Sequence, residues 1–159
     1  MRRTARQLSR SPVFGSGFTL VEMMVVIAIL AIMAGIAAPA FRDMIAAEKL
    51  RSAASALTES LWLARSEAIK RNANVTFSIT DVGTGWQVTT SADTATPLHV
   101  QEPIGGVTSG AARFEFNAYG RLVSADRKIQ LQASNISRYS CVSISDTGRV
   151  TVVQTQCGS

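Results

Sequence analysis

Hydrophobic and polar residues divide the chain into stretches of different character, and the most distinct stretch is a long apolar run near the N-terminus. Residues 18–38 read FTLVEMMVVIAILAIMAGIAA, 21 residues in which Glu22 is the single charged side chain. Folded as a helix, this run is about 31 Å long, which matches the hydrocarbon core of a bilayer. The pattern therefore predicts one membrane-spanning helix.

From residue 41 onward the apolar residues keep a helical period but occupy one face. Their alternating spacings of three and four are typical of a helix with one buried face. Glu67 and Arg71 are spaced for an i,i+4 ion pair. The positions on the predicted buried face are Ala47, Leu50, Ala54, Leu57, Leu61, Ala64 and Ala68.

Together the two patterns predict a single helix over residues 18–72. Residues 18–40 form its membrane-embedded half, and residues 41–72 continue it as an amphipathic helix outside the membrane. Pro39 lies near the junction of the two halves. Because proline lacks a backbone N–H, we expect Pro39 to kink or locally loosen the helix.

Residues 73–159 have the pattern of short strands separated by turns, which predicts a small antiparallel β-sheet. Residues 146–148 (Asp-Thr-Gly) fit a three-residue hairpin loop with Gly148 in the left-handed conformation. Residues 92–110 are expected to form an irregular loop. The fold class is α+β, with a long N-terminal helix packed on the sheet. The expected strands are residues 75–80, 86–90, 113–117, 129–133, 139–145 and 149–154.

The charge of the chain depends strongly on position. The 159 residues carry a formal net charge of +5, which alone would suggest nucleic acid or an anionic membrane as partner. Four arginines and no acid precede the apolar run, whereas residues 18–159 hold 12 bases and 11 acids. Arginines on one side of a span predict a cytoplasmic N-terminus and an exported remainder. Most of the net charge therefore reports membrane orientation.

An ordinary secretory signal peptide is the alternative for the apolar run. Residues 38–40 (Ala-Pro-Ala) offer an A-x-A-like cleavage site. The run is, however, longer than the 7–15 residues typical of a signal peptide, and it holds a carboxylate near its start. The sequence therefore favours a retained membrane helix.

Glu22 requires an explanation, because a carboxylate in a bilayer costs about 2.5–3.5 kcal/mol on insertion scales. No Lys, Arg or His occurs in residues 13–41, so this stretch supplies no side-chain cation. Cleavage after Gly17 would create one, the α-amine of Phe18, four residues from Glu22. Alternatively, Glu22 reaches the cytoplasmic interface.

The junction resembles the class III signal of type IV prepilins and type II secretion pseudopilins. The resemblance is carried by the basic leader ending in Gly17, by the residues FTLVE that follow from Phe18 to Glu22, and by the apolar run. It implies that a prepilin peptidase cleaves between Gly17 and Phe18, removing residues 1–17. It also implies N-methylation of Phe18, and pairing of Glu22 with the terminal amine of a neighbouring subunit during filament assembly.

Three further segments resemble the GspH/FimT branch of this family: LARSEAIKR (63–71), FNAYGR (116–121) and SDTGRV (145–150). The resemblance implies a type IV pilin-like fold and a single-pass inner-membrane protein with a cytoplasmic N-terminus and a periplasmic head, residues 73–159. The partners it implies are other minor and major pilins or pseudopilins, the prepilin peptidase and the inner membrane. Such a subunit primes assembly at or near the tip of a pilus or pseudopilus. Secretion-dedicated pseudopilin and DNA-binding pilin are the alternatives within the branch.

Cys141 and Cys157 both lie in the exported part, where an oxidising periplasm favours a disulfide. Two cysteines and the distant His99 do not make a tetrahedral metal set. In the predicted hairpin Cys141 lies near Val153 rather than opposite Cys157, so the tail must fold back. Members of the branch often carry such a bridge.

No catalytic motif, metal site or cofactor site is recognisable, and we expect a protein without enzymatic activity. DNA binding is a stronger alternative than enzymatic activity, since residues 103–159 hold six basic and three acidic side chains. In DNA-binding relatives a Gly-Arg pair is followed by a second arginine, which is missing after Gly148-Arg149. Arginines that merely solvate a sheet edge explain the same charges. The candidate DNA-binding residues are Arg121, Arg127, Lys128, Arg138 and Arg149.

Overall fold

The computed structural model describes residues 17–158, and the predicted leader lies outside this range except for Gly17. The chain divides into two compact units, one ending at Ala38 and the other starting at Pro39. One helix, α1 (Leu20–Arg71), contributes to both units and continues through Pro39. The predicted helix of residues 18–72 is thus confirmed to within two residues, while the kink at Pro39 stays a prediction.

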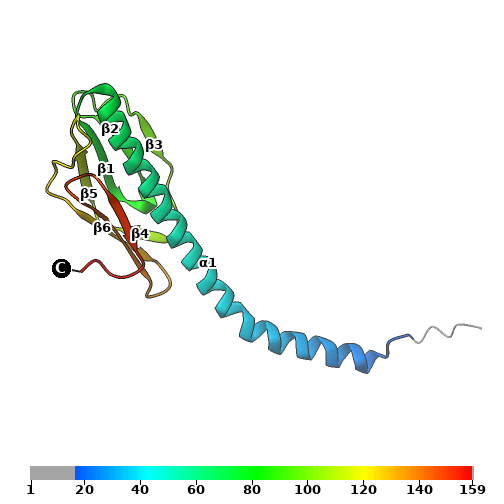
Figure 1. Cartoon of the computed structure of the whole chain (residues 1–159). Coiled ribbons are helices and arrows are strands. Elements are labelled where there is room, and N and C mark those ends of the chain that lie inside the picture. The colour runs from blue at the N-terminus through cyan, green and yellow to red at the C-terminus, as the bar shows by residue number, and fades with distance from the viewer. Residues whose placement is uncertain (1–16, 159) are drawn as a thin grey trace, which may run out of the picture. The chain divides into compact units, whose positions relative to one another are not determined.

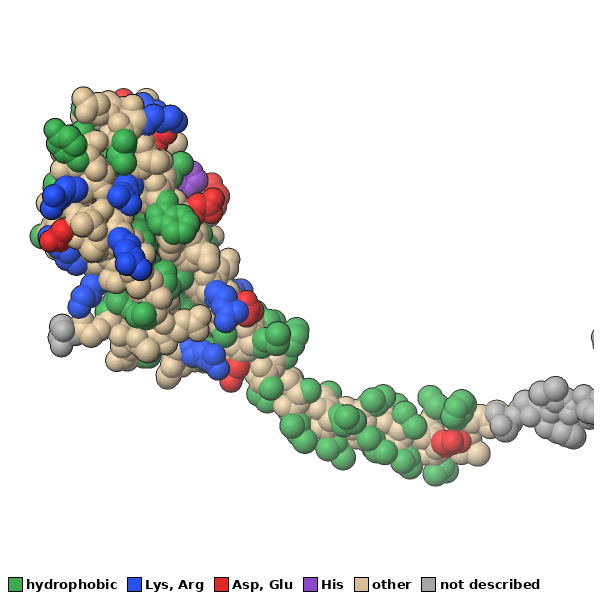
Figure 2. All heavy atoms as spheres, in the orientation of Figure 1, with side chains coloured by type: hydrophobic (Ala, Val, Ile, Leu, Met, Phe, Trp, Pro, Cys, Tyr) green, Lys and Arg blue, Asp and Glu red, His purple; other side chains and the backbone are tan. Residues whose placement is uncertain are grey.

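In the first unit, α1 exposes its apolar side chains on every side. Each residue from Leu20 to Ala38 is exposed within the chain, and Figure 2 shows this segment covered with hydrophobic side chains. Among the described residues, α1 is the one helix long and apolar enough to cross a membrane. Such a surface requires lipid or other helices to cover it.

The second unit is a head in which the rest of α1 packs against two four-stranded antiparallel sheets (Figure 1). A single 3₁₀ turn, η1 (Val82–Thr84), connects β1 to β2. The first sheet has the order β3-β2-β1-β5, and the second has the order β4-β6-β7-β8. The strands are β1 (Val75–Asp81), β2 (Gly85–Thr90), β3 (His99–Gln101), β4 (Val107–Ser109), β5 (Ala112–Phe116), β6 (Lys128–Ala133), β7 (Tyr139–Ile144) and β8 (Val150–Val153).

The expectation of an irregular loop over residues 92–110 is wrong, because this segment contributes β3 and β4. Each strand has three residues, too few for an alternating pattern to be visible in the sequence. Pairing with longer strands holds them in place: β3 pairs with β2, and β4 pairs with β6. β3 and β4 each add an edge strand, and the strands form two separate sheets rather than the expected single one.

The core of the head forms where α1 meets the two sheets, and its aromatic side chains come from the first sheet. Trp86 of β2 donates a hydrogen bond from Nε1 to Oγ of Ser60 on α1, at 2.9 Å. The ring of Phe77 lies 6.2 Å from that of Trp86 and 5.9 Å from that of Phe114. Of the predicted buried face of α1 all but Ala47, which is half-buried, are buried, and Ala53 and Ser60 are buried in addition.

The C-terminal hairpin has the predicted geometry. Gly148 has a φ of 75°, and Cys141 pairs with Val153 across β7 and β8. The tail then folds back, so that Cys141 and Cys157 form a disulfide with their Cα atoms 5.0 Å apart. The backbone N–H of Cys157 also donates to Oε1 of Gln130 at 3.1 Å. The predicted disulfide is therefore confirmed, with its tail anchored on β6.

Candidate functional site

The predicted cleavage site lies in a short non-helical segment just before α1. Residues 17–19 have no regular secondary structure, and the side chain of Phe18 is 76% exposed. A peptide bond that is exposed and outside a helix is accessible to a peptidase. The Gly17–Phe18 bond thus has the surroundings that proteolytic processing requires.

The helix begins at Leu20 because Thr19 caps it. The backbone N–H of Glu22 donates to Oγ1 of Thr19 at 3.2 Å, which satisfies one of the N–H groups that a helix start leaves unpaired. Threonine followed three residues later by glutamate is the capping-box pattern. That pattern was visible in the sequence and could have located the helix start two residues more accurately.

The cap places Glu22 in the first turn of α1, where the partial positive charge of the helix dipole favours a carboxylate. Apolar side chains surround it along the helix, including Val21, Met23 and Met24, which are all exposed. A cation that pairs with Glu22 would therefore approach it through an otherwise apolar surface.

On the head, two Gly-Arg pairs from different turns meet against α1. Gly120 and Gly148 both have a positive φ, at 70° and 75°. A Cβ atom on Gly148 would lie 2.3 Å from the carbonyl oxygen of Gly120. Nε of Arg65 on α1 donates to that same carbonyl at 3.0 Å. The close contact brings together the next residues in the chain, Arg121 and Arg149.

Asp146, in the loop of the β7–β8 hairpin, connects Arg127 to the contact between Gly120 and Gly148. The N–H of Leu122 donates to the carbonyl oxygen of Asp146 at 3.1 Å, and the guanidinium of Arg127 forms an ion pair with the Asp146 carboxylate. Lys128, the next residue, contacts the carbonyl of Gly158 in the tail. We call Arg121, Arg127 and Arg149 the hairpin basic cluster.

Arg138, the fifth predicted DNA-binding residue, does not belong to this cluster. Its carbonyl accepts a hydrogen bond from the N–H of Ala133, at the end of β6 opposite to Lys128. The structure thus places three of the five predicted basic residues around the hairpin, whereas Lys128 contacts the tail and Arg138 lies at the other end of β6. Figure 2 shows Lys and Arg side chains distributed over the visible face of the head, with acidic side chains between some of them.

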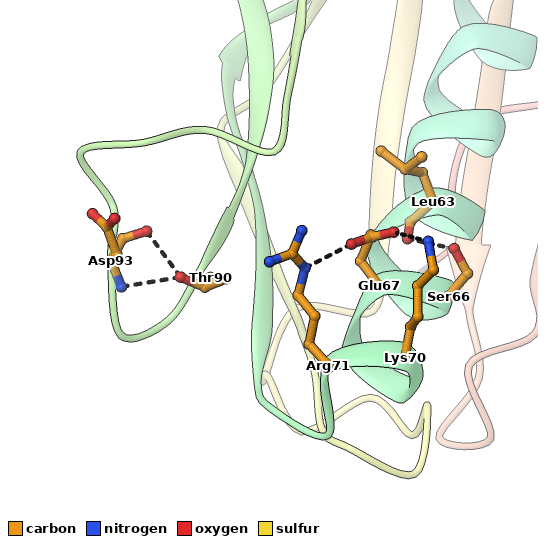
Figure 3. Close-up of polar contacts among 7 residues, drawn as sticks. All are labelled: Leu63, Ser66, Glu67, Lys70, Arg71, Thr90 and Asp93. Atoms are coloured by element: carbon orange, nitrogen blue, oxygen red, sulfur yellow. Dashed lines mark hydrogen bonds and ion pairs between the residues drawn. The ribbon is translucent and has the colours of Figure 1, made fainter.

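The C-terminal end of α1 carries the predicted ion pair. Glu67 accepts from Nε of Arg71 at 2.6 Å and from Nζ of Lys70 at 3.1 Å (Figure 3). The hydrogen bond from Arg71, followed by that from Lys70, lowers the pKa of Glu67 below its ordinary value. Lys70 and Arg71 also lie in the last helical turn, where the helix dipole favours cations.

A second carboxyl group with a lowered pKa is that of Asp93, in the loop between β2 and β3. A hydrogen bond from the hydroxyl of Thr96 lowers this pKa, and so do the backbone N–H groups of Ala95 and Thr96. The N–H of Asp93 donates to Oγ1 of Thr90 at 3.1 Å (Figure 3). These contacts join the last residue of β2 to the start of the loop and order the loop backbone.

Among residues 17–158, no group of three or more His, Cys, Asp or Glu side chains is arranged to hold a metal ion. His99 lies in β3, at the edge of the first sheet. The absence of enzymatic activity stays a prediction.

Two family models match the sequence. The model described as Type II transport protein GspH matches residues 53–148, and the model described as Prokaryotic N-terminal methylation motif matches residues 16–38. The first match runs from the amphipathic part of α1 to Gly148, and the second covers the cleavage junction and the apolar run.

The fold is similar to that of the type IV minor pilin FimU of Pseudomonas aeruginosa. One crystal structure of that protein is 24% identical in sequence, covers 67% of this chain and 89% of its own, and superposes with a TM-score of 0.58. Another is 25% identical, covers 65% and 92%, and gives a TM-score of 0.56. The comparison with curated proteins found no match.

Proposed function

Because the chain belongs to the GspH family of type IV pilin-like proteins, we propose that it is a minor subunit that primes a type IV pilus or a type II pseudopilus at or near its tip. Prepilin peptidase cleaves it between Gly17 and Phe18, and Phe18 is then N-methylated. The observation that supports this proposal most strongly is the exposed Gly17–Phe18 junction, followed at once by a capped apolar helix with Glu22 in its first turn.

In this proposal the protein stays in the inner membrane until assembly. The arginines before the apolar run hold the N-terminus in the cytoplasm. The disulfide between Cys141 and Cys157 agrees with a head in the oxidising periplasm. Other pilins or pseudopilins then cover the apolar surface of α1 in the filament.

Priming and tip placement are tested together by deleting the gene and restoring it with an epitope-tagged copy. Deletion should lower the number of surface filaments while the remaining filaments keep their length, because a priming subunit acts at initiation. Immunogold labelling of the restored strain should mark filament ends. Label distributed along the whole filament, or unchanged filament numbers after deletion, would contradict the proposal. Twitching and protein-secretion assays of the deletion strain then assign the machine.

DNA capture is a second candidate function, favoured by the contact between Gly120 and Gly148. No second arginine follows Arg149 in the sequence, but Arg121 directly follows Gly120, whose backbone contacts Gly148. Among the described residues, neither side chain forms an ion pair, so both can contact phosphates.

A gel-shift titration of duplex DNA at several salt concentrations tests this candidate. Arg121→Ala and Arg149→Ala should each weaken binding and lower the slope of log affinity against log salt by about 1. Arg138→Ala is the control, because it removes the same charge at the other end of β6. If the wild-type protein does not bind DNA at low salt, DNA capture is excluded.

A further inference from the structure

A groove of about 840 Å³ lies between α1 and the end of the second sheet, within the head. On the α1 side it is lined by apolar side chains that include Leu50, Ala54 and Trp62. Tyr139 of β7 and Val152 of β8 line the opposite side. Trp62 is 58% exposed and Val152 is 40% exposed, so two large apolar side chains of the groove remain accessible to solvent. We call this feature the α1–β8 groove.

The strand beside the groove has a free edge. β8 is the last strand of its sheet and pairs with β7 alone among the described strands. Two of the other sheet edges are covered: β5 receives a hydrogen bond from the N–H of Val123, and β4 donates one from the N–H of Ser109 to Asp81. The edge of β3 is also open but has three residues. β8 therefore offers the longer open edge.

The hydrogen-bonding register shows which groups of β8 are available. The N–H of Ser145 donates to the carbonyl of Arg149 at 3.0 Å, so this pair is of the hydrogen-bonded type. Bonded and non-bonded pairs alternate in antiparallel strands, which makes Ile144–Val150 and Val142–Val152 non-bonded. The N–H and C=O groups of Val150 and Val152 consequently point away from β7, toward the free edge.

The groove lies on the face of the sheet that α1 covers. Val142 is fully buried in the core, and its partner Val152 projects from the same face of the sheet. An additional strand beside β8 would therefore extend this face and place alternate side chains between Val152 and Trp62. Such strand addition uses main-chain hydrogen bonds for affinity and side-chain pockets for specificity.

The charges around the groove are mixed. Arg138 and Glu59 both line it, and neither forms an ion pair within residues 17–158. Arg51 is already paired with Glu48 at 3.1 Å. A nucleic acid would bring phosphates toward the carboxylate of Glu59, which would repel them. A polypeptide can instead offer a carboxylate to Arg138 and leave Glu59 facing solvent or a basic side chain. The mixed charges therefore fit a polypeptide.

We propose that the α1–β8 groove binds an extended segment of another pilin-like subunit, which adds to β8 as a fifth strand. The segment places an apolar side chain between Val152 and Trp62 and an acidic side chain near Arg138. This inference rests on the proposed function, because membership of a filament-forming family supplies the neighbouring subunits, and it specifies where one of them docks.

Site-specific photocrosslinking in cells that assemble the filament tests this proposal. The full chain carries p-benzoylphenylalanine in place of Gln154, which lines the groove, and the crosslinked partner and peptide are identified by mass spectrometry. The expected product joins this chain to another pilin-like subunit through a segment of strand-forming sequence.

Two variants test whether the open edge of β8 is responsible. Val152→Pro removes an N–H that points away from β7, so the β7–β8 pairing is retained while crosslinking falls by about tenfold. Val152→Lys places a charge on the same edge and should have a similar effect. Val100→Lys, an exposed valine on the β3 edge, is the control and should leave crosslinking unchanged.

The outcomes separate this inference from the proposed function. A pilin-like partner whose crosslink is lost in both Val152 variants but kept in Val100→Lys supports the groove. Crosslinks to a second copy of this chain, to lipid or to nothing overturn it. If the protein is nevertheless processed at Phe18 and recovered with filaments, the proposed function stands without the groove. If it is not recovered with filaments, both are wrong.

Discussion

Glu22 shows how one residue can be favourable for its own helix and still require a partner. The helix dipole favours the carboxylate in the first turn, where the N–H of Glu22 bonds to Thr19, yet insertion of the carboxylate in a bilayer costs about 2.5–3.5 kcal/mol. The α-amine of a processed Phe18 is the cation that cleavage creates. The charge of Glu22, rather than its size, should therefore matter for assembly.

Glu22→Gln tests this requirement, because it keeps the size and the polarity of the side chain and removes its charge. We expect the variant to be cleaved and inserted normally while its incorporation into filaments falls strongly. Immunoblots of membranes and of sheared filaments measure the two steps. Glu48→Gln, an exposed glutamate of the head, should be incorporated like the wild type. Normal incorporation of Glu22→Gln would contradict the role of the charge.

Gly148 has a backbone conformation and a close contact that a larger residue could not adopt without strain. Its φ is 75°, and a Cβ atom would lie 2.3 Å from the carbonyl oxygen of Gly120. Gly148→Ala should destabilise the protein by about 1–3 kcal/mol, which urea unfolding would measure. Gly105→Ala is the matched control, because Gly105 has no positive φ and open space around its Cα. Equal unfolding midpoints for the two variants would be inconsistent with this geometry.

The ion pairs of Glu67 make a small, pH-dependent contribution to stability. The pKa of Glu67 is lowered in the folded chain from an ordinary value of 4.5. A lowered pKa means that the contribution is present above pH 4.5 and is lost as the pH falls through the folded value. Helical pairs of this exposure contribute roughly 0.5 kcal/mol each. Urea midpoints should fall less between pH 7 and pH 3 in Glu67→Gln than in the wild type.

Among the secondary-structure elements, the long helix was predictable from its local sequence pattern, whereas the shortest strands form because of the strands they pair with. α1 was recognised over its 52 residues because its first part is a continuous apolar run and its second part repeats the spacings of three and four. β3 and β4 have three residues each and are strands because β2 and β6 lie beside them. No local pattern carries that information. The β7–β8 register was predictable, because the hairpin loop and Gly148 specify it.

The same limit applies to the candidate sites. Gly17, Phe18 and Glu22 are adjacent in the sequence, so a local motif identified them. The proximity of Arg121 and Arg149 depends on the contact between Gly120 and Gly148, which are 28 positions apart. The separation of Arg138 from that cluster likewise depends on the length of β6.

The disulfide fixes the C-terminal tail to the second sheet. It closes a sequence separation of 16, for which chain entropy predicts about 3 kcal/mol of stabilisation. The double variant Cys141→Ser/Cys157→Ser should lose about that amount in urea unfolding under oxidising conditions. The wild type in excess reductant should show the same shift. An unchanged midpoint in both samples would mean that the bridge does not stabilise the head.

At the scale of the molecule, three segments of the sequence that resemble the GspH/FimT branch meet in one place. Arg65 comes from the first, Gly120 from the second and Gly148 from the third, and they contact one another at the hairpin. The residues that carry the resemblance to the family are therefore the ones that hold the turn at Gly120 and the hairpin at Gly148 against α1. The basic excess of the whole chain has a different origin, since residues 18–159 hold 12 bases and 11 acids.

Processing and N-methylation of this chain as a filament subunit are measured by the mass of its mature N-terminal peptide. Protein purified from membranes and from sheared filaments is digested, and the N-terminal peptide is sequenced by mass spectrometry. We expect a first residue of Phe18 carrying one methyl group, and we expect this peptide to be lost when Gly17 is replaced by a bulky residue. A mature protein that begins at Phe41, or one that retains residues 1–17 in the filament, would contradict this expectation.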